Sequence, residues 1–297
     1  MARRSVEDLA ASAVWPAGAA LSQQEFCAWV QNEGAARYRD LPWRGIDDAY
    51  GVLVSEVMLQ QTQVKRVLGR WERWMCMFPT PDALAAAAPS DVLAEWQGLG
   101  YNRRALSLKR AAEECSEKFG GALPEGVDAL QALPGIGPAT AAGVTAFARN
   151  APAVYIETNV RTVFIHTLFP EAEAVSDKQL EPLVAACCPP AGQVRAWYYA
   201  LLDVGAYLKT QVANPSRRSA HYAKQSAFEG SRRQKRAELV RIVLACPGIT
   251  RAEAAARLSA EEQAAGREAV DSNLFASIVA DLTQEGFFRE EDGRLIP

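Results

Sequence analysis

The chain has 297 residues, of which 49% are hydrophobic, so it can form two or three packed domains and is not expected to be disordered. No apolar run approaches the roughly 18 residues of a membrane span, and the opening MARRSVEDLAA lacks an apolar signal segment, so we expect a cytoplasmic protein. The net charge of −3 is unlike that of a basic nucleic-acid-binding domain, and the six cysteines, with no C-x-x-C pair, argue against disulfides and metal sites.

Helical patterns dominate the chain to about residue 230. Apolar residues recur at spacings of three and four, as in Leu53, Val57 and Val64, and period-two alternation is almost absent. Pro and Gly clusters divide this region into helices of ordinary length. The main breaks fall at residues 79–82, 88–91, 120–121, 133–137, 188–192 and 214–215.

A different pattern follows residues 216–236, a basic stretch with seven Lys or Arg and one Glu. A helix to Ala245, a Pro247–Gly248 break, a helix in ITRAEAAARL, a third helix from about Ser272 and the hairpin sequence GFFREEDGRLIP come in turn. This order is typical of a small winged-helix module. An α-helical cap packed on the main domain would give the same pattern, so both interpretations stay open.

The segment LQALPGIGPATAAGV, residues 130–144, predicts two helices joined by a tight turn. Gly135 and Gly137 would let backbone amides approach a phosphate closely, and the next helix would add the positive end of its dipole. Such a turn binds a DNA backbone without reading its sequence. An ordinary helix C-cap would explain the same glycines.

This hairpin resembles the helix-hairpin-helix of DNA glycosylases of the endonuclease III and MutY superfamily, and four further motifs follow that family's order. They are LPWR at 41–44, SEVMLQQTQV at 55–64, WQGLGYNRRA at 96–105 and ETNVRTVF at 157–164. SEVMLQQTQV is nearest to the adenine DNA glycosylases, because endonuclease III-type enzymes differ after the leucine. The resemblance implies a mostly α, two-domain body whose cleft receives a base flipped out of the duplex.

The resemblance also implies that Glu56 is the general acid, which protonates a purine ring nitrogen and makes the base a leaving group. Its sequence neighbours Val54, Val57 and Leu59 are apolar, and a carboxyl in such surroundings keeps its proton near neutral pH. General-acid help is typically worth about 10²–10⁴-fold in rate. A solvated Glu on an amphipathic helix is the alternative.

The second carboxylate predicted from the family is Glu157, at a position where the family has Asp. Bond cleavage leaves a sugar with oxocarbenium character, which needs a carboxylate on its other side. The added methylene of Glu moves the carboxylate by about 1 Å, and such misplacement can cost on the order of 10² in rate. Three interpretations of Glu157 stay open. It replaces the family Asp in the same reaction, it belongs to a site adapted to another base or sugar, or it occurs in a DNA-binding protein that has lost catalytic activity.

Further residues resemble DNA contacts or supports of the base pocket. Gln60, Gln61 and Thr62 would lie against DNA and fill the vacated stack, or they simply form a polar surface. Tyr101–Asn102 stands where the family has a tyrosine pair, so one intercalating ring is missing. The DNA-binding set also includes Gly135, Gly137, Thr140, Arg103, Arg217 and Arg218, and the base-pocket set is Trp43, Tyr101 and Asn159.

The cysteines that hold an iron–sulfur cluster in the family are replaced here by Lys209, Ser216, Ser219 and Gln225. We therefore expect no 4Fe-4S cluster and no other metal, apart from a monovalent ion that the hairpin has room to bind. We expect Tyr222 and Phe228, with cross-bonds from Ser and Asn, to hold the loop, leaving its arginines to bind phosphates. A solvated basic linker is the alternative.

Two further departures limit the activity that the resemblance implies. Bifunctional relatives use a Lys two residues after the second hairpin glycine, where this chain has Ala139, so we predict a monofunctional glycosylase. Relatives that read 8-oxoguanine carry a nucleotide-hydrolase-like domain, for which the segment after residue 236 is too short. The resemblance therefore does not extend to recognition of 8-oxoguanine.

We predict an all-α, two-domain helix-hairpin-helix glycosylase fold with a small C-terminal winged-helix-like module. Residues 47–155 would form a six-helix domain with the hairpin, residues 20–46 and 156–230 a second helical domain with the basic loop, and residues 231–297 the accessory module. The predicted function is base-excision repair of double-stranded DNA carrying a mispair or lesion, with adenine as the favoured base, by a nucleoid-associated monomer without a membrane partner. The alternatives are a glycosylase for a deaminated or methylated base and a non-catalytic mispair-binding protein.

Overall fold

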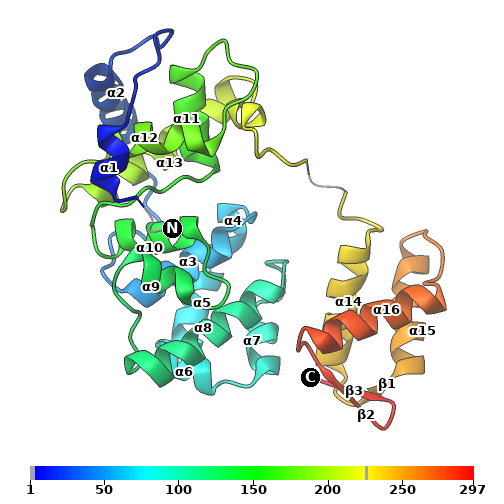
Figure 1. Cartoon of the computed structure of the whole chain (residues 1–297). Helices are drawn as coiled ribbons and strands as arrows, with labels where there is room; N and C mark the ends of the chain where they lie inside the picture. Colours follow the sequence, from blue (N-terminus) through cyan, green and yellow to red (C-terminus); the bar gives the residue numbers. More distant parts are fainter. Residues whose placement is uncertain (1–3, 225–226) are drawn as a thin grey trace. The chain divides into compact units, whose positions relative to one another are not determined.

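A computed structural model of the chain describes residues 4–224 and 227–297 (Figure 1). Contacts divide the chain into two compact units, each assembled from segments distant in sequence. The first unit comprises residues 1–56 and 123–224, and the second comprises residues 57–122 and 225–297. Both are mainly helical, which confirms the fold class predicted from apolar spacing.

The first unit is entirely helical apart from its connections and holds both predicted catalytic carboxylates. Its elements are α1 (Val6–Ala11), α2 (Gln23–Ala36), most of α3 (Ala49–Leu59), α9 (Val127–Ala132), α10 (Pro138–Phe147), α11 (Thr158–Leu168), α12 (Asp177–Cys187), α13 (Val194–Gln211) and the 3₁₀ helix η1 (Pro215–Arg218).

Aromatic packing holds α2, α11 and α13 together in the core of this unit. The buried ring of Phe26 on α2 lies 4.9 Å from that of Phe164 on α11 and 6.4 Å from that of Trp197 on α13. Edge-to-face pairs of this kind add about 0.5–1.5 kcal/mol each beyond the burial of their area. These contacts hold the middle of α11 and the first turn of α13 against α2.

The second unit begins with a cluster of short helices around one longer helix. These are α4 (Val64–Val67), α5 (Arg70–Met77), α6 (Pro81–Ala86), α7 (Pro89–Glu95) and α8 (Arg103–Phe119). Prolines start α6 and α7, where the missing N–H has no helical partner to lose. Trp74 is fully buried, with its ring 5.3 Å from Trp96 and 4.9 Å from Phe78.

The rest of the second unit has the element order that the sequence predicted for residues 231–297. It contains α14 (Arg232–Ala245), β1 (Ile249–Thr250), α15 (Arg251–Ala264), α16 (Ser272–Gln284), β2 (Arg289–Glu291) and β3 (Arg294–Ile296). The strands form an antiparallel sheet in the order β1-β3-β2. The winged-helix assignment stays an interpretation of this order.

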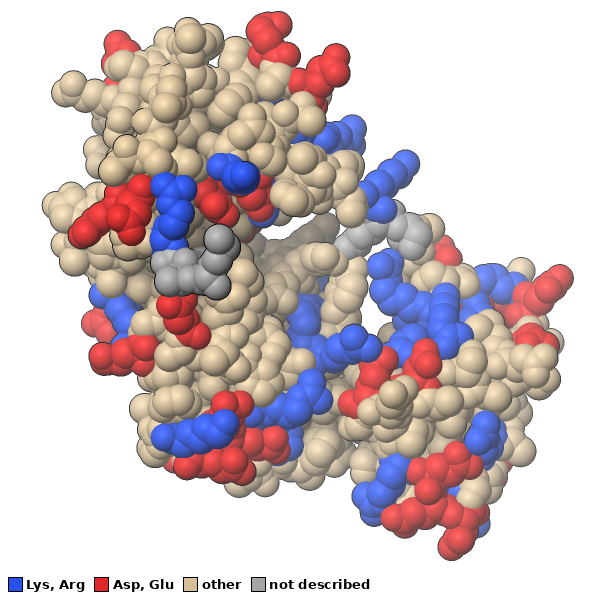
Figure 2. Space-filling view, in the orientation of Figure 1, with Lys and Arg blue, Asp and Glu red and all other residues tan. Residues whose placement is uncertain are grey.

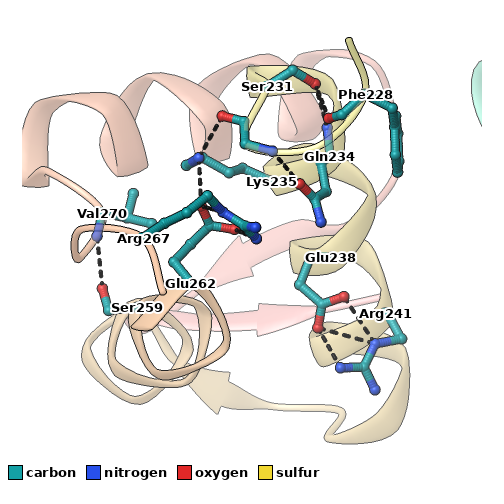
Figure 3. A network of polar contacts seen from close by, with 11 residues as sticks. Phe228, Ser231, Gln234, Lys235, Glu238, Arg241, Ser259, Glu262, Arg267 and Val270 are labelled. Carbon is teal, nitrogen blue, oxygen red and sulfur yellow. Dashed lines mark hydrogen bonds and ion pairs between the residues drawn. The ribbon is translucent and has the colours of Figure 1, made fainter. Parts of the chain in front are cut away.

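A buried ion network ties α14 to α15 (Figure 3). Glu262 accepts hydrogen bonds from Arg267 Nε and Nη2, both at 2.8 Å, and pairs with Lys235 Nζ at 2.7 Å. Lys235 also donates to the carbonyl of Gly230 at 2.7 Å. Because each charge is paired, the network can be buried without an isolated ion, and it fixes the start of α14 against the end of α15.

Charge is unevenly distributed over residues 231–297. Lys and Arg side chains gather over the beginning of α14, whereas basic and acidic side chains alternate around the β2–β3 hairpin (Figure 2). In winged-helix proteins the third helix enters the DNA groove, but α16 contains no Lys or Arg. The segment therefore lacks the cations that would favour DNA binding through that helix.

The two units do not follow the predicted boundaries at residues 47 and 156. The hairpin helices α9 and α10 belong to the first unit rather than with residues 57–122. Aromatic contacts explain this, because Phe147 on α10 stacks on Tyr199 of α13 with ring centroids 4.7 Å apart, and Tyr155 lies 5.4 Å from Tyr198. None of the helices in the described part of the chain is long and apolar enough to cross a membrane.

Candidate active site

Glu56 lies near the C-terminal end of α3, in contact with α10 and the segment before α11. The Tyr155 hydroxyl is hydrogen-bonded to the Glu56 carboxyl. Gly143 of α10 lies on another side of the same carboxyl, since a Cβ atom on this glycine would overlap Glu56 Oε2 and lie 3.0 Å from the Tyr155 ring. The carboxyl is therefore confined by a phenol and by the bare backbone of a helix.

Glu157 is the N-cap of α11 and lies in the same unit as Glu56. Its Oε1 accepts hydrogen bonds from the backbone amides of Asn159, at 2.6 Å, and Val160, at 3.3 Å. The N-cap position normally favours the shorter Asp, Asn, Ser or Thr. The longer Glu side chain nevertheless reaches the same amides, so the positive end of the α11 dipole acts on its carboxylate.

The two carboxyl groups differ in what surrounds them. Both residues keep part of their surface accessible, yet protein atoms surround them closely enough for desolvation to dominate. Burial and the charge of Glu157 raise the pKa of Glu56 to about 8, and the hydrogen bond from Tyr155 partly opposes this rise. Burial also raises the pKa of Glu157, but the charges of Lys209 and Arg161 and the two amide hydrogen bonds oppose that rise.

This difference suits one group to carry a proton and the other to carry a charge. A carboxyl with a pKa of about 8 is protonated at neutral pH and can act as a general acid. A carboxylate at a helix N-terminus, with cations near it, is favoured in its charged form. The geometry can therefore deliver a proton from Glu56 while Glu157 stabilises positive charge.

Gly143 provides a direct test of how Glu56 is placed. Gly143→Ala would add a methyl group where Glu56 Oε2 now lies, so we expect the carboxyl to be displaced and the single-turnover rate of a reaction that uses its proton to fall by about 10²-fold. Gly18→Ala, in an open loop position of the same unit, is the matched control and should leave the rate unchanged. A Gly143→Ala protein with the wild-type rate would contradict this placement.

The predicted hairpin is present as α9, a tight turn and α10. Gly135 adopts a φ of +75°, a left-handed conformation that favours glycine. Gly137 is the N-cap of α10, with Pro138 in the first turn. Thr140 is buried in α10, and its predicted DNA contact stays a prediction.

Comparisons with known proteins address the segment that contains these features. Residues 54–190 match the family described as HhH-GPD superfamily base excision DNA repair protein. An adenine DNA glycosylase of Mycolicibacterium smegmatis is 40% identical over 192 residues, a match that covers 64% of this chain and 64% of that protein. The chain thus spans less than two thirds of the length of this relative.

Solved structures agree at the level of the fold. A thermostable thymine-DNA glycosylase superposes with a TM-score of 0.54 at 24% identity, covering 62% of this chain and 86% of that one. A trapped endonuclease III–DNA covalent intermediate gives a TM-score of 0.53 at 20% identity, covering 63% and 87%. The HhH-GPD segment therefore has the expected helix-hairpin-helix glycosylase fold.

The three residues that follow α3 do not continue the helix. α3 ends at Leu59, and Gln61 adopts a φ of +53°. Arg104 fixes this turn by donating to the carbonyls of Val57 at 2.7 Å and Gln60 at 2.6 Å. Gln60 and Gln61 are thereby held on a turn, where their predicted contact with DNA stays a prediction.

Thr62, Tyr101 and Arg103 are placed differently from one another. Thr62 is buried and its hydroxyl accepts from Arg104 Nη2 at 3.1 Å, so its side chain supports the turn instead of filling a base stack. Tyr101 is 38% exposed in a left-handed conformation with a φ of +50°. Arg103 is exposed and pairs with Glu285 at 2.6 Å, an interaction that a phosphate could replace because exposed ion pairs are weak.

The basic loop is held by Arg218 and not by aromatic packing. Arg218 Nη1 donates to the carbonyls of Phe169 at 2.5 Å and of Pro170 and Ala172 at 3.0 Å. Its guanidinium is thereby engaged at the end of α11, which gives it a structural role in place of the predicted phosphate contact. Arg217 is exposed, so a phosphate contact by this residue stays a prediction.

The predicted contributions to this loop from Ser and Asn are present, but those from the aromatic residues are not. Asn214 Oδ1 accepts from the Ser216 hydroxyl at 2.8 Å, and Ala220 N donates to the Val175 carbonyl at 2.8 Å. Tyr222 and Phe228 are 45% and 48% exposed, so the expectation that they pack under the loop was wrong. Hydrogen bonds from the backbone and from the Arg218 guanidinium hold the loop at the surface of the unit.

The residues at the family's cluster positions do not fit an iron–sulfur cluster. Lys209 is an ammonium, Ser216 and Ser219 are buried hydroxyls, and Gln225 lies outside the described residues. None of the four is a thiol, which such clusters require. In the described ranges 4–224 and 227–297, no group of three or more His, Cys, Asp or Glu side chains could hold a metal ion.

Trp43 supports the fold near the site. It is buried, and the neighbouring Arg44 forms a bidentate pair with Asp203 of α13 at 2.8 and 2.9 Å. Arg39 also donates to Asp203 Oδ1 at 2.5 Å. The LPWR motif therefore anchors the chain before α3 to α13.

Sequence reasoning missed four residues that shape the site: Gly143, Tyr155, Lys209 and Asp203. These residues lie within or beside motifs that the sequence analysis recognised, and this proximity was a signal that could have marked them as candidates. Their roles depend on contacts with distant residues, such as that between Lys209 Nζ and Asn159 Oδ1 at 2.7 Å across 50 positions. Of the predicted pocket residues, the structure brings Asn159 to Glu157.

Proposed function

We propose that this protein hydrolyses the N-glycosidic bond of a mispaired or damaged base in double-stranded DNA, with adenine as the favoured base. The observation that carries the proposal is the pairing of Glu56, whose pKa is raised to about 8, with Glu157 at the N-terminus of α11. The adenine DNA glycosylase name of the 40% identical relative supports the choice of base.

The two carboxyl groups divide the reaction between them. Glu56 donates its proton to a ring nitrogen of the flipped purine, and the bond from C1′ to the base breaks with its electron pair going to the base. Glu157 stabilises the cationic sugar and accepts a proton from the water that attacks C1′. The products are the free base and an abasic site.

The reaction should stop at base removal. Ala139, in the first turn of α10, supplies no amine at the position where bifunctional relatives carry Lys. An imine to the sugar, which strand cleavage by β-elimination requires, has no nucleophile at that position. We propose a monofunctional enzyme that acts as a monomer, without an iron–sulfur cluster, in the cytoplasm and at the nucleoid.

The test of this function is single-turnover cleavage on a panel of duplexes, followed by alkali. The panel holds A opposite 8-oxoguanine, A opposite G, hypoxanthine, uracil and a T·G mispair. We expect strand breaks at A, only after alkali, since a monofunctional glycosylase leaves an alkali-labile abasic site. Breaks at another base would indicate a retuned glycosylase, and binding without any break would indicate a mispair-binding protein.

A further inference from the structure

Asn159 links Glu157 to α13 through two separate groups. Its backbone amide donates to Glu157 Oε1 at 2.6 Å. Its side-chain Oδ1 accepts from Lys209 Nζ at 2.7 Å. Any movement of Asn159 therefore changes the hydrogen bond that holds the carboxylate.

α13 approaches Asn159 unusually closely. A Cβ atom on Gly205 would overlap the Asn159 carbonyl oxygen, so glycine is needed for this approach. Lys209 lies one turn after Gly205 and on the same face of the helix, because residues four apart align along an α-helix. The two residues together hold the first turn of α11.

The charges near Glu157 come from several elements. Lys209 on α13 and Arg161 on α11 favour the charged form of Glu157, and of the two Lys209 has the larger effect. Arg161 is shared with Asp177, which it binds at 2.6 Å. Glu56 on α3 and Tyr155 before α11 lie close enough to Glu157 for its charge to raise their pKa values.

We propose that Lys209 is a positioning residue for Glu157: by holding Asn159 it fixes the amide that caps the carboxylate, and it places an ammonium near that carboxylate. The proposal rests on the proposed function for its catalytic consequence. Lys209 stands where the resemblance places a cluster cysteine, so in this chain a cation occupies that position.

This role follows from the length of Glu157. A Glu side chain has one more rotatable bond than Asp, so it adopts more positions unless its surroundings restrict it. The amide of Asn159 removes that freedom only while Asn159 itself stays fixed. Lys209, which is half-buried and loses solvation there, contributes both the hydrogen bond and a charge of the needed sign.

The first experiment is the pH dependence of the single-turnover rate for Lys209→Met, with Lys209→Arg and the exposed Lys178→Met as controls. Loss of the ammonium raises the pKa of Glu157, so the acidic limb of the profile should move to higher pH. At pH 7 we expect the rate to fall by about 10-fold to 100-fold at saturating DNA. Lys209→Arg should recover most of that loss, and Lys178→Met should match wild type.

The second experiment is thermal unfolding of Lys209→Met, Glu157→Gln and the double variant between pH 5 and pH 8. Lys209→Met leaves a partly buried carboxylate without its cation, so its melting temperature should fall most at pH 8 and recover towards pH 5. The double variant should lose less than the sum of the two single losses, by about 2–4 °C.

Several outcomes would overturn the proposal. Additive losses in melting temperature, or a rate that falls equally at every pH, would reduce Lys209 to a packing residue. Weaker DNA binding with the wild-type rate at saturation would make it a phosphate contact. If wild type cleaves none of the duplexes, the proposed function fails, while the melting data still decide whether Lys209 holds Glu157.

Discussion

Glu56→Gln should reduce the single-turnover rate of base release by about 10²–10⁴-fold while DNA affinity stays near that of wild type. The amide keeps the shape of the protonated carboxyl but has no acidic proton to give to the leaving base. In wild type the rate should fall as the pH rises through about 8, where Glu56 loses its proton. Glu173→Gln, an exposed carboxylate of the same unit, is the control and should behave as wild type.

The same variant should change the pH dependence of stability. In the folded protein the pKa of Glu56 is about 8, whereas its ordinary value is 4.5. Between pH 4.5 and pH 8 the folded state therefore binds more protons than the unfolded state. The stability linked to this proton is therefore full below pH 4.5 and is lost as the pH rises to 8. Glu56→Gln should unfold at a higher temperature than wild type at pH 8, and the gap should close towards pH 5. A glycosylase that keeps its rate without this carboxyl would rule out Glu56 as the acid.

Asp203→Ala should lower the free energy of unfolding of the first unit by about 3–5 kcal/mol. The substitution leaves the buried Arg44 guanidinium without its bidentate partner and removes the hydrogen bond from Arg39. An uncompensated buried charge costs more than the net value of the original pair. The measurement is urea unfolding followed by fluorescence, and a loss of this size would also lower the melting temperature by roughly 10 °C.

The control for Asp203→Ala is Glu33→Ala. Glu33 of α2 pairs at 2.7 Å with Arg37, the C-cap residue of that helix, and both side chains are partly exposed. Such pairs contribute about 0–1 kcal/mol, so the control should stay close to wild type. If Asp203→Ala were equally mild, the LPWR motif would not be anchored through this ion network.

The fold class and the two carboxylates could be predicted because their signals are local. Apolar spacing at three and four specifies amphipathic helices irrespective of where they pack. Gly135 specifies a tight turn through its left-handed backbone conformation, and the motifs around Glu56 and Glu157 are continuous in sequence. The sequence by itself therefore determined the helical class and the hairpin, and through the family resemblance it singled out Glu56 and Glu157 as candidate acids.

The surroundings of those acids were decided by the tertiary structure. Gly143 leaves room for Glu56, and Lys209 reaches Asn159 across 50 positions of the chain. Local patterns also misassigned Arg218, because its guanidinium binds carbonyls at the end of α11. Each of these roles depends on which surfaces meet when helices distant in sequence pack, and packing depends on the whole core. Local sequence thus named the candidate reacting groups, and tertiary contacts set their positions and surroundings.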